Sequence, residues 1–172
     1  FFEIWKEPIK RAPALRRPEI LERAVNESCL QPESFVRTLL VDSAAVISRL
    51  ALQAGRIAEA AEACVETLRS GGKILTAGNG GSAAEALHMA EEFVGRFREN
   101  RPSLPAICLS ADPTVLTCIA NDFGYDEVFA RQIEGLGRPG DLVVLFTTSG
   151  NARNLERALD TAQKKGMRVL CL

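Results

Sequence analysis

Residues 73–82 read Lys-Ile-Leu-Thr-Ala-Gly-Asn-Gly-Gly-Ser. The first half is a short, mostly apolar run, typical of a buried strand, and the second half is a turn rich in glycine. Apolar residues recur at helical spacing from Ser82 onward, so a helix is expected directly after the turn. A buried strand that leads through a tight turn into a helix is typical of α/β proteins with a parallel sheet.

The same unit repeats towards the C-terminus. Short apolar runs predict three more strands, at residues 106–109, 141–146 and 167–172. Helical spacing of apolar residues predicts helices at residues 82–98, 113–120, 126–134 and 154–165. We therefore expect an α/β fold of three layers, in which a parallel sheet is flanked by helices on both faces.

Two more helices are expected within residues 34–70, with a joint near residues 53–55. Gly71-Gly72 then ends the second helix. The first helix carries an apolar face that is more extensive than the sheet can cover, so we expect the two helices to take part in oligomer packing. The residues of this face are Phe35, Leu39, Val46 and Leu50.

Residues 1–34 are expected to form a proline-rich arm, and residues 35–172 the folded domain. The arm holds four of the eight prolines, at positions 8, 13, 18 and 32. Proline at this density prevents a long helix, so at most one short helix is expected, near residues 18–28. The basic pairs at residues 10–11 and 16–17 leave two interpretations open, a flexible or packed tail and a basic docking arm.

The composition excludes several classes of protein. With 47% apolar and 25% charged residues, the 172-residue chain is expected to be globular rather than disordered. A net charge of −1 gives no general attraction to nucleic acid, and no apolar run reaches the roughly 20 residues that a membrane span needs. The five cysteines form no CxxC pair, which favours a reducing, cytoplasmic location. Because the chain starts at Phe1 and ends in an apolar run at Leu172, we expect a fragment or an incompletely observed chain.

Two strand-to-helix turns carry residues suited to binding an anion. One covers residues 78–82, and the other covers residues 147–151, Thr-Thr-Ser-Gly-Asn. Both are expected at the carboxyl edge of the sheet, where backbone N–H groups, hydroxyls and positive helix ends can hold a phosphate. Glycine also serves the geometry of a tight turn, so each turn alone is ambiguous, whereas the pair favours phosphate binding.

A dinucleotide site is the alternative for the first turn, because residues 78–83 fit the pattern GxGxxA. Such a site needs an acidic residue about 20 residues further on, which binds the ribose. The nearest candidate is Asp112, 34 residues after Gly78, and this scheme leaves the second turn unexplained. A phosphate site is therefore the preferred interpretation.

The helix after the first turn carries His88 and Glu92, four residues apart and on one face. His88 is the single histidine of the chain, and a lone histidine is more often packed or solvated than functional. The carboxylate one turn away favours a functional pair, either two ligands of a metal or an acid/base couple. Glu91 lies about 100° round the helix and is expected to be solvated. Asn121-Asp122 ends an apolar helix and, from composition alone, indicates a helix stop.

Five segments together resemble the phosphoheptose isomerases, the sedoheptulose 7-phosphate isomerase branch of the sugar isomerase (SIS) domain family. These segments are residues 78–82, 90–93, 98–102, 121–124 and 148–151. Their order and spacing match the family over residues 35–172. The resemblance implies a five-stranded parallel sheet in a homotetramer, with a sugar-phosphate substrate bound at active sites between subunits.

The resemblance also implies which residues form the site. Substrate binding is implied for Asn79, Gly80, Gly81, Ser82, Asn121, Asp122, Thr147, Thr148 and Ser149, of which the last three hold the phosphate. Glu92 matches the catalytic glutamate, and His88 with Glu92 matches half of a zinc site, which implies one zinc ion per subunit. The family's other catalytic histidine and a glutamine ligand are expected beyond Leu172. Thr147 and Ala152 replace two serines of the family's phosphate loop, and Ala152 lacks a hydroxyl donor.

The resemblance implies an aldose–ketose isomerase that converts sedoheptulose 7-phosphate to D-glycero-D-manno-heptose 7-phosphate through an enediol, in lipopolysaccharide heptose biosynthesis. The alternative is a non-catalytic SIS-domain regulator, which binds the replication initiator protein or senses a sugar phosphate. The initiator-binding members lack a glutamate at the position of Glu92, so this residue favours the enzyme.

Overall fold

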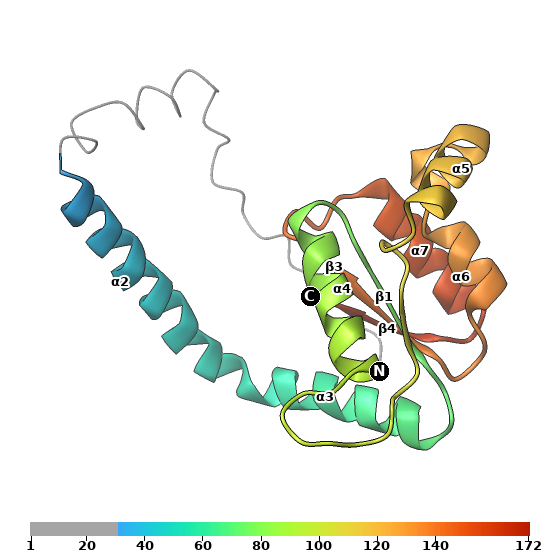
Figure 1. Ribbon diagram of the computed structural model, residues 1–172, viewed down its shortest axis with the longest axis horizontal. Coiled ribbons are helices and arrows are strands. Elements are labelled where there is room, and N and C mark those ends of the chain that lie inside the picture. Colours follow the sequence, from blue (N-terminus) through green and yellow to red (C-terminus); the bar gives the residue numbers. More distant parts are fainter. Residues whose placement is uncertain (1–30) are drawn as a thin grey trace. The chain divides into compact units, whose positions relative to one another are not determined.

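A computed structural model gives the structure of residues 31–172 (Figure 1). The chain divides into two units, Phe1–Ala54 and Gly55–Leu172. The short helix predicted near residues 18–28, and all but the last residues of the predicted arm, lie outside the described residues.

The described part of the first unit is helical. Helix α2 covers Pro32–Leu50, and a 3-10 turn, Ala51–Gln53, follows it at the predicted joint. Pro32 lies in the first turn of α2, where the missing N–H of proline leaves no helical hydrogen bond unmade, so the helix begins inside the segment predicted as an arm. No residue of α2 is buried. Half or more of the side chain is exposed at Phe35, Leu39, Val46 and Leu50.

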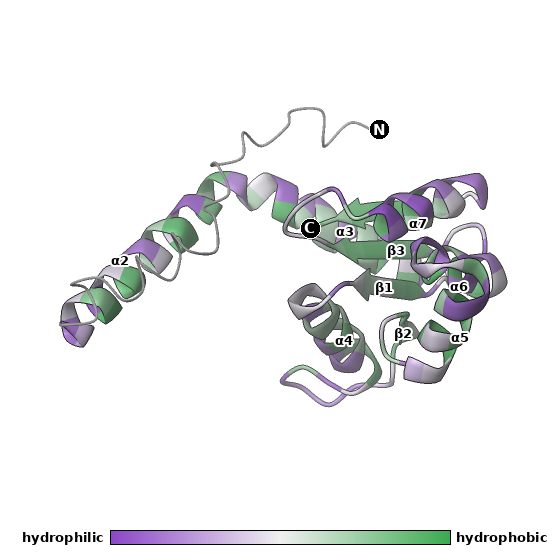
Figure 2. Ribbon diagram, turned by 90° about the horizontal axis from the view of Figure 1, so that it is seen from above, coloured by the Kyte–Doolittle hydropathy of each residue, from purple (hydrophilic) through white to green (hydrophobic). Residues whose placement is uncertain are grey.

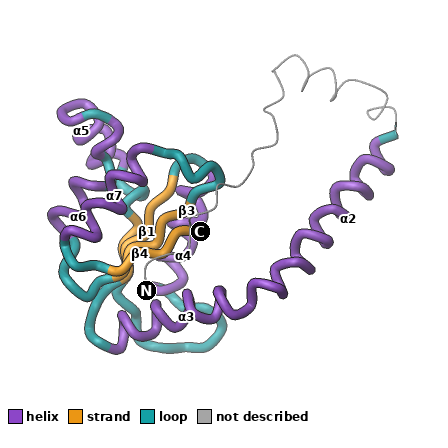
Figure 3. Tube along the Cα trace, turned by 180° about the vertical axis from the view of Figure 1, so that it is seen from behind, coloured by secondary structure: helices purple, strands orange, loops and turns teal. Residues whose placement is uncertain are grey.

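The second unit contains a parallel sheet, whose strands are orange in Figure 3. The strand order is β2-β1-β3-β4. The strands are β1 (Ile74–Gly78), β2 (Ala106–Cys108), β3 (Leu142–Phe146) and β4 (Arg168–Cys171). All four predicted strands are confirmed, and their ends lie within one residue of the predicted ends. The resemblance implied five strands, of which residues 31–172 supply four.

Helices cover both faces of this sheet (Figure 2). They are α3 (Ala54–Arg69), α4 (Gly81–Val94), α5 (Pro113–Phe123), α6 (Ala130–Leu136) and α7 (Arg153–Lys164). On one face, Cys64 of α3 and Met89 of α4 pack against Ile74 and Val144. On the other face, α5, α6 and α7 enclose Leu75 and its neighbours. The predicted three-layer α/β fold is confirmed. None of the helices in the described part of the chain is long and apolar enough to cross a membrane.

Three helices of the second unit differ from their predicted ranges by more than one residue. α5 ends at Phe123, three residues beyond its predicted end. α4 ends at Val94 instead of residue 98: Gly95 is its C-cap residue, and the Arg101 guanidinium donates hydrogen bonds to carbonyl groups in the last turn. The range 126–134, predicted as one helix, is divided between a 3-10 turn, Tyr125–Glu127, and α6.

A buried ion pair joins the starts of β1 and β3. The Asp141 side chain is 4% exposed, lies 2.5 Å from Lys73 Nζ, and accepts hydrogen bonds from the backbone N–H groups of Lys73 and Arg138. Burial by itself would raise the pKa of the Asp141 carboxyl, but the hydrogen bonds and the charge of Lys73 outweigh burial and lower the pKa below its usual value. The pair therefore holds the two central strands together at the edge opposite the glycine-rich turn.

Candidate functional site

The geometry of the turn after β1 requires glycine. A Cβ atom on Gly78 would lie 2.4 Å from the carbonyl oxygen of Ser82, so the strand and α4 approach too closely for a side chain. Gly80 precedes α4 with φ of +56°, in the region that favours glycine. Among residues 31–172, the backbone N–H groups of Gly80 and Gly81 make no hydrogen bond to another backbone group. The turn therefore presents two N–H donors at the positive end of α4.

The turn after β3 is shaped by its own hydroxyl groups. Gly150, with φ of +66°, donates from its N–H to Thr147 Oγ1 at 3.0 Å, and Ser149 Oγ accepts from the N–H two residues further on at 3.3 Å. Ala152 occupies the N-cap position of α7, and no side chain caps the helix there. In the described part of the chain, the N–H groups of Thr148 and Ser149 have no acceptor. This turn therefore presents hydroxyls and N–H donors at a second helix start.

The two turns lie side by side at the carboxyl edge of the sheet. β1 and β3 are neighbours in the sheet, and Gly78 is paired with Phe146 at their ends. From the end of β2, the Ser110 hydroxyl donates to the Gly78 carbonyl at 2.9 Å and accepts from the Gly78 N–H at 3.2 Å. Three neighbouring strand ends thus contribute to one region, as the parallel order of the strands predicts.

Side chains that the sequence did not single out connect the two turns. Asn154, in the first turn of α7, is 3% exposed and forms a reciprocal amide pair with Asn79, in which each side chain donates to the other at 2.9 Å. The Tyr125 hydroxyl donates to Asn79 Oδ1 at 3.0 Å. The one signal in the sequence for the contact of Asn154 was that this polar residue lies beside the apolar face of α7. Nothing in the sequence marked Tyr125 or Ser110.

Asn121 and Asp122 lie exposed at the end of α5. The Asn121 side-chain amide donates to Asp122 Oδ1 at 2.8 Å, and the Cys118 thiol lies 3.8 Å from Asp122 Oδ2. Within the described residues, no hydrogen bond joins Asn121 or Asp122 to either turn. The segment reaches the glycine-rich turn through Tyr125, which follows three residues after Asp122.

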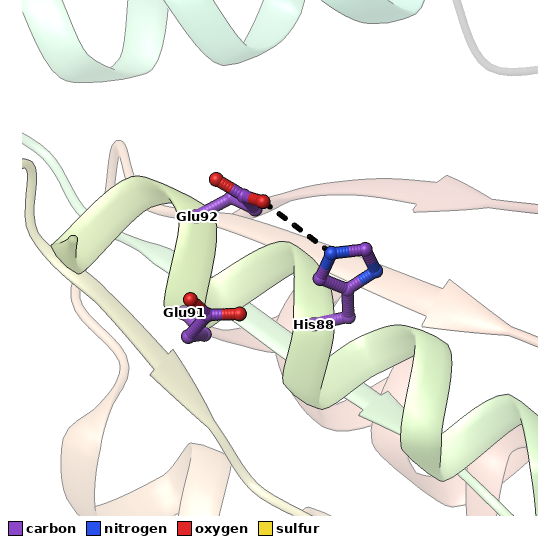
Figure 4. A group of neighbouring side chains, drawn as sticks. All are labelled: His88, Glu91 and Glu92. Atoms are coloured by element: carbon purple, nitrogen blue, oxygen red, sulfur yellow. Dashed lines mark ion pairs between the residues drawn. The ribbon is translucent and has the colours of Figure 1, made fainter. Parts of the chain in front are cut away.

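His88, Glu91 and Glu92 form a cluster on α4 (Figure 4). His88 Nε2 lies 3.4 Å from Glu92 Oε1, and the ligand atoms of all three side chains lie within 4.8 Å of one another. In a tetrahedral zinc site with bonds of about 2.1 Å, neighbouring ligand atoms are roughly 3.4 Å apart. The His88–Glu92 distance therefore fits two ligands of one ion. Glu91 is exposed, as expected, but its carboxylate also belongs to the cluster.

The cluster and the glycine-rich turn lie at opposite ends of α4. At a rise of 1.5 Å per residue, the helix places Ser82 and Glu92 about 15 Å apart along its axis. Arg101 holds the far end of the helix by donating to the carbonyl oxygens of Glu92 and Phe93. Within one subunit, the predicted site residues thus form one group at the two turns, a pair at the end of α5 and another group towards the end of α4.

The sequence matches the SIS domain family over residues 40–172. It is 46% identical to the phosphoheptose isomerase of Akkermansia muciniphila over 138 residues, which are 80% of this chain and 73% of that protein. A solved phosphoheptose isomerase from Francisella tularensis is 32% identical, with a TM-score of 0.73 over 81% of this chain and 74% of that one. The solved phosphoheptose isomerase from Neisseria gonorrhoeae is 38% identical, with a TM-score of 0.67 over 79% of this chain and 73% of that one. The chain therefore belongs to the SIS domain family, in its phosphoheptose isomerase branch.

Proposed function

We propose that this protein converts sedoheptulose 7-phosphate to D-glycero-D-manno-heptose 7-phosphate, a step towards the heptose of bacterial lipopolysaccharide. Membership of the phosphoheptose isomerase branch makes the protein an isomerase of the SIS domain family. The observation that carries the substrate class is the pairing of two turns, rich in N–H and hydroxyl donors, at the ends of adjacent strands β1 and β3. We place the reaction in the cytoplasm, in line with the cysteine usage of the chain.

The two turns would bind the phosphate of the substrate. The N–H groups of residues 80 and 81 and the donors of Thr147, Thr148 and Ser149 lie at the starts of α4 and α7, whose positive ends favour an anion. Asn121 and Asp122 would face the open-chain sugar. Anchoring the phosphate fixes the far end of the substrate, so the two reacting carbons take defined positions.

Glu92 would act as the base. Its carboxylate takes a proton from C1 of the ketose, the bonding pair forms the C1–C2 double bond, and the C2 oxygen gains a proton to give the enediol. Return of a proton to C2, with loss of the proton from the C1 hydroxyl, leaves an aldehyde at C1. The family resemblance supplies the second acid–base group, a histidine beyond Leu172.

A zinc ion would be held by His88 and Glu92, one per subunit, with Glu91 as a further carboxylate beside them. When bound, the ion would act as a Lewis acid towards the oxygens of the sugar. Glu92 Oε1 is the oxygen that faces His88, which leaves Oε2 of the same carboxylate for proton transfer.

We propose a homotetramer in which neighbouring subunits complete each other's active sites. A sugar phosphate bound at the turns would have to extend along nearly the whole of α4, about 15 Å, to reach Glu92 of the same subunit. A neighbouring subunit that brought the end of its own α4 to the turns would place its Glu92 directly at the sugar. The exposed apolar side chains of α2 offer a surface for such an assembly.

Incubation with sedoheptulose 7-phosphate labelled with 13C at C1 tests the proposal. Carbon NMR should show the hydroxymethyl carbon converted to the anomeric carbon of an aldose. Unphosphorylated sedoheptulose is the control, and its kcat/KM should be at least about a hundredfold lower, because several charge-assisted hydrogen bonds are lost. Tight binding of the sugar phosphate without conversion would instead support the non-catalytic regulator or sensor.

A further inference from the structure

We propose that Asn154 is a positioning residue that holds the glycine-rich turn against the start of α7, so that the two turns act on one phosphate. Its amide pair with Asn79 is the direct side-chain link between the turn after β1 and the helix after β3. This inference rests on the proposed function, because it requires that both turns bind the same phosphate.

The Asn79 amide is almost fully occupied by the protein itself. A side-chain amide has two donor hydrogens and an oxygen with two lone pairs. Asn154 Nδ2 and the Tyr125 hydroxyl fill the two acceptor positions of Asn79 Oδ1, and Asn79 Nδ2 donates one hydrogen to Asn154 Oδ1. The side chain of Asn79 therefore acts mainly as a link, and the backbone N–H groups of Gly80 and Gly81 remain for the phosphate.

The turn needs such a link because its glycine residues leave the backbone free to adopt many conformations. Gly80 and Gly81 follow Asn79 directly, and each glycine loses more conformational freedom on ordering than any other residue would. The Ser110 hydroxyl anchors the turn at Gly78, on the side of β2. On the side of α7, the anchor is the Asn79–Asn154 pair, and Asn154 is buried at 3% exposure, where an unpaired amide is costly.

The remaining partner, Tyr125, is itself held to α7. In the 3-10 turn that begins with this residue, Glu127 pairs with Arg157 at 2.7 Å and Asp126 pairs with Arg153 at 3.5 Å. The 3-10 turn and the start of α7 are thus fixed to each other, and both contact Asn79. A loss of Asn154 should therefore loosen the glycine-rich turn without removing any group that touches the phosphate in our proposal.

Asn154→Leu is the variant that tests the role of this residue, because it keeps the branching of the side chain at Cγ and removes every hydrogen bond of the amide. Its binding constant for inorganic phosphate, measured by calorimetry, should weaken about tenfold. The KM for the sugar phosphate should rise by the same factor while kcat changes less than about threefold. This pattern is expected when the lost interaction is equally strong in the bound substrate and in the transition state. Leu159→Ala is the matched control in α7: it should lower the melting temperature but leave phosphate binding within about twofold.

A double-mutant cycle tests whether Asn154 acts through Asn79. Asn79→Leu alone, Asn154→Leu alone and the double variant should each weaken phosphate binding about tenfold, because all three remove the same link. A double variant weakened about a hundredfold would mean that the two side chains act independently, which overturns the inference. Phosphate binding by Asn154→Leu within about twofold of the unsubstituted protein would overturn it as well.

Tyr125→Phe keeps the inference testable if Asn154→Leu does not fold. Tyr125 is 61% exposed, so the change removes one hydroxyl at little cost to the fold, and phosphate binding should weaken about threefold. Unchanged binding in this variant would then overturn the inference. An unsubstituted protein that neither binds phosphate nor isomerises the sugar phosphate would overturn the proposed function, and with it this inference.

Discussion

His88 Nε2 and Glu92 Oε1 lie 3.4 Å apart on successive turns of α4. At this distance the two atoms can bind one tetrahedral ion, and a protonated imidazole could equally pair with the carboxylate. Metal content distinguishes the two arrangements, because only the first one loses an ion when the histidine is removed.

Replacing His88 with alanine should remove zinc from the protein. Elemental analysis after dialysis should show about one zinc ion per subunit in the unsubstituted protein and a small fraction of that in His88→Ala, because the imidazole is lost as a ligand. Glu134→Gln, on α6 at the other face of the sheet, is the control and should keep its zinc. Full activity in metal-free protein would rule out the zinc assignment and leave Glu92 as a plain base.

Replacing Ala152 with serine should tighten phosphate binding. Ala152 is at the N-cap of α7 without a capping side chain, so a serine should stabilise the helix by about 1 kcal/mol and add a hydroxyl donor beside the phosphate turn. We expect phosphate affinity to rise about threefold. Ala152→Gly separates the two effects, since it changes the cap without adding a hydroxyl. Equal phosphate affinity in the serine and glycine variants would contradict a direct contact.

Asp141→Asn should destabilise the protein in a manner that depends on pH. Because its pKa is lower in the folded protein than in the unfolded chain, the Asp141 carboxyl contributes stability above the unfolded value of 3.8, and this contribution is lost as the pH falls through the folded value. At pH 7 the variant should lose about 2–4 kcal/mol in urea unfolding, because Lys73 is left without its buried partner. The difference should shrink below pH 4; a constant difference from pH 7 to pH 3 would contradict this account.

Introducing charged residues into the apolar face of α2 should dissociate the proposed oligomer. Leu39 and Val46 are seven residues apart and half exposed, so they share one face of the helix. The double change to aspartate should convert the proposed tetramer, measured by light scattering, to smaller species and reduce activity in parallel. Ser48→Asp, on the opposite face, should leave the tetramer intact. An unsubstituted protein that is monomeric at micromolar concentration would contradict the proposal that this face packs against other subunits.

The fold was predictable where local pattern determines it. Each of the four strands is a short, mostly apolar run preceded within two residues by glycine, proline or a charged residue, and the strand ends were predicted within one residue. The end of α4 was predicted four residues too late although Gly95 marks it in the sequence; the contact of Arg101 with the last turn had no such signal. Glu91 is exposed as predicted, but its place near His88 and Glu92 was not predicted, because helical angle fixes the direction of Cβ and leaves a flexible side chain free to turn back.

The candidate site was predictable to the extent that its residues are local in sequence. The two turns could be identified from glycine and hydroxyl content, and the parallel order predicted that they share an edge. The amide pair of Asn79 with Asn154 joins residues 75 positions apart, and the Tyr125–Asn79 hydrogen bond joins residues 46 positions apart. No periodicity signals such contacts, because they depend on the strand order and on the packing of α7.

The turnover rate of the Glu92→Gln variant tests most directly the central claim, that Glu92 is the base. The amide keeps the shape and most hydrogen bonds of the carboxylate but cannot take a proton from C1, so kcat for sedoheptulose 7-phosphate should fall at least about a thousandfold. Substrate affinity, measured by calorimetry, should stay within about tenfold, and Glu134→Gln should retain normal turnover. Zinc content measured on the same samples separates loss of the base from loss of the metal. Turnover within a few-fold of the unsubstituted protein would contradict the assignment of Glu92 as the base.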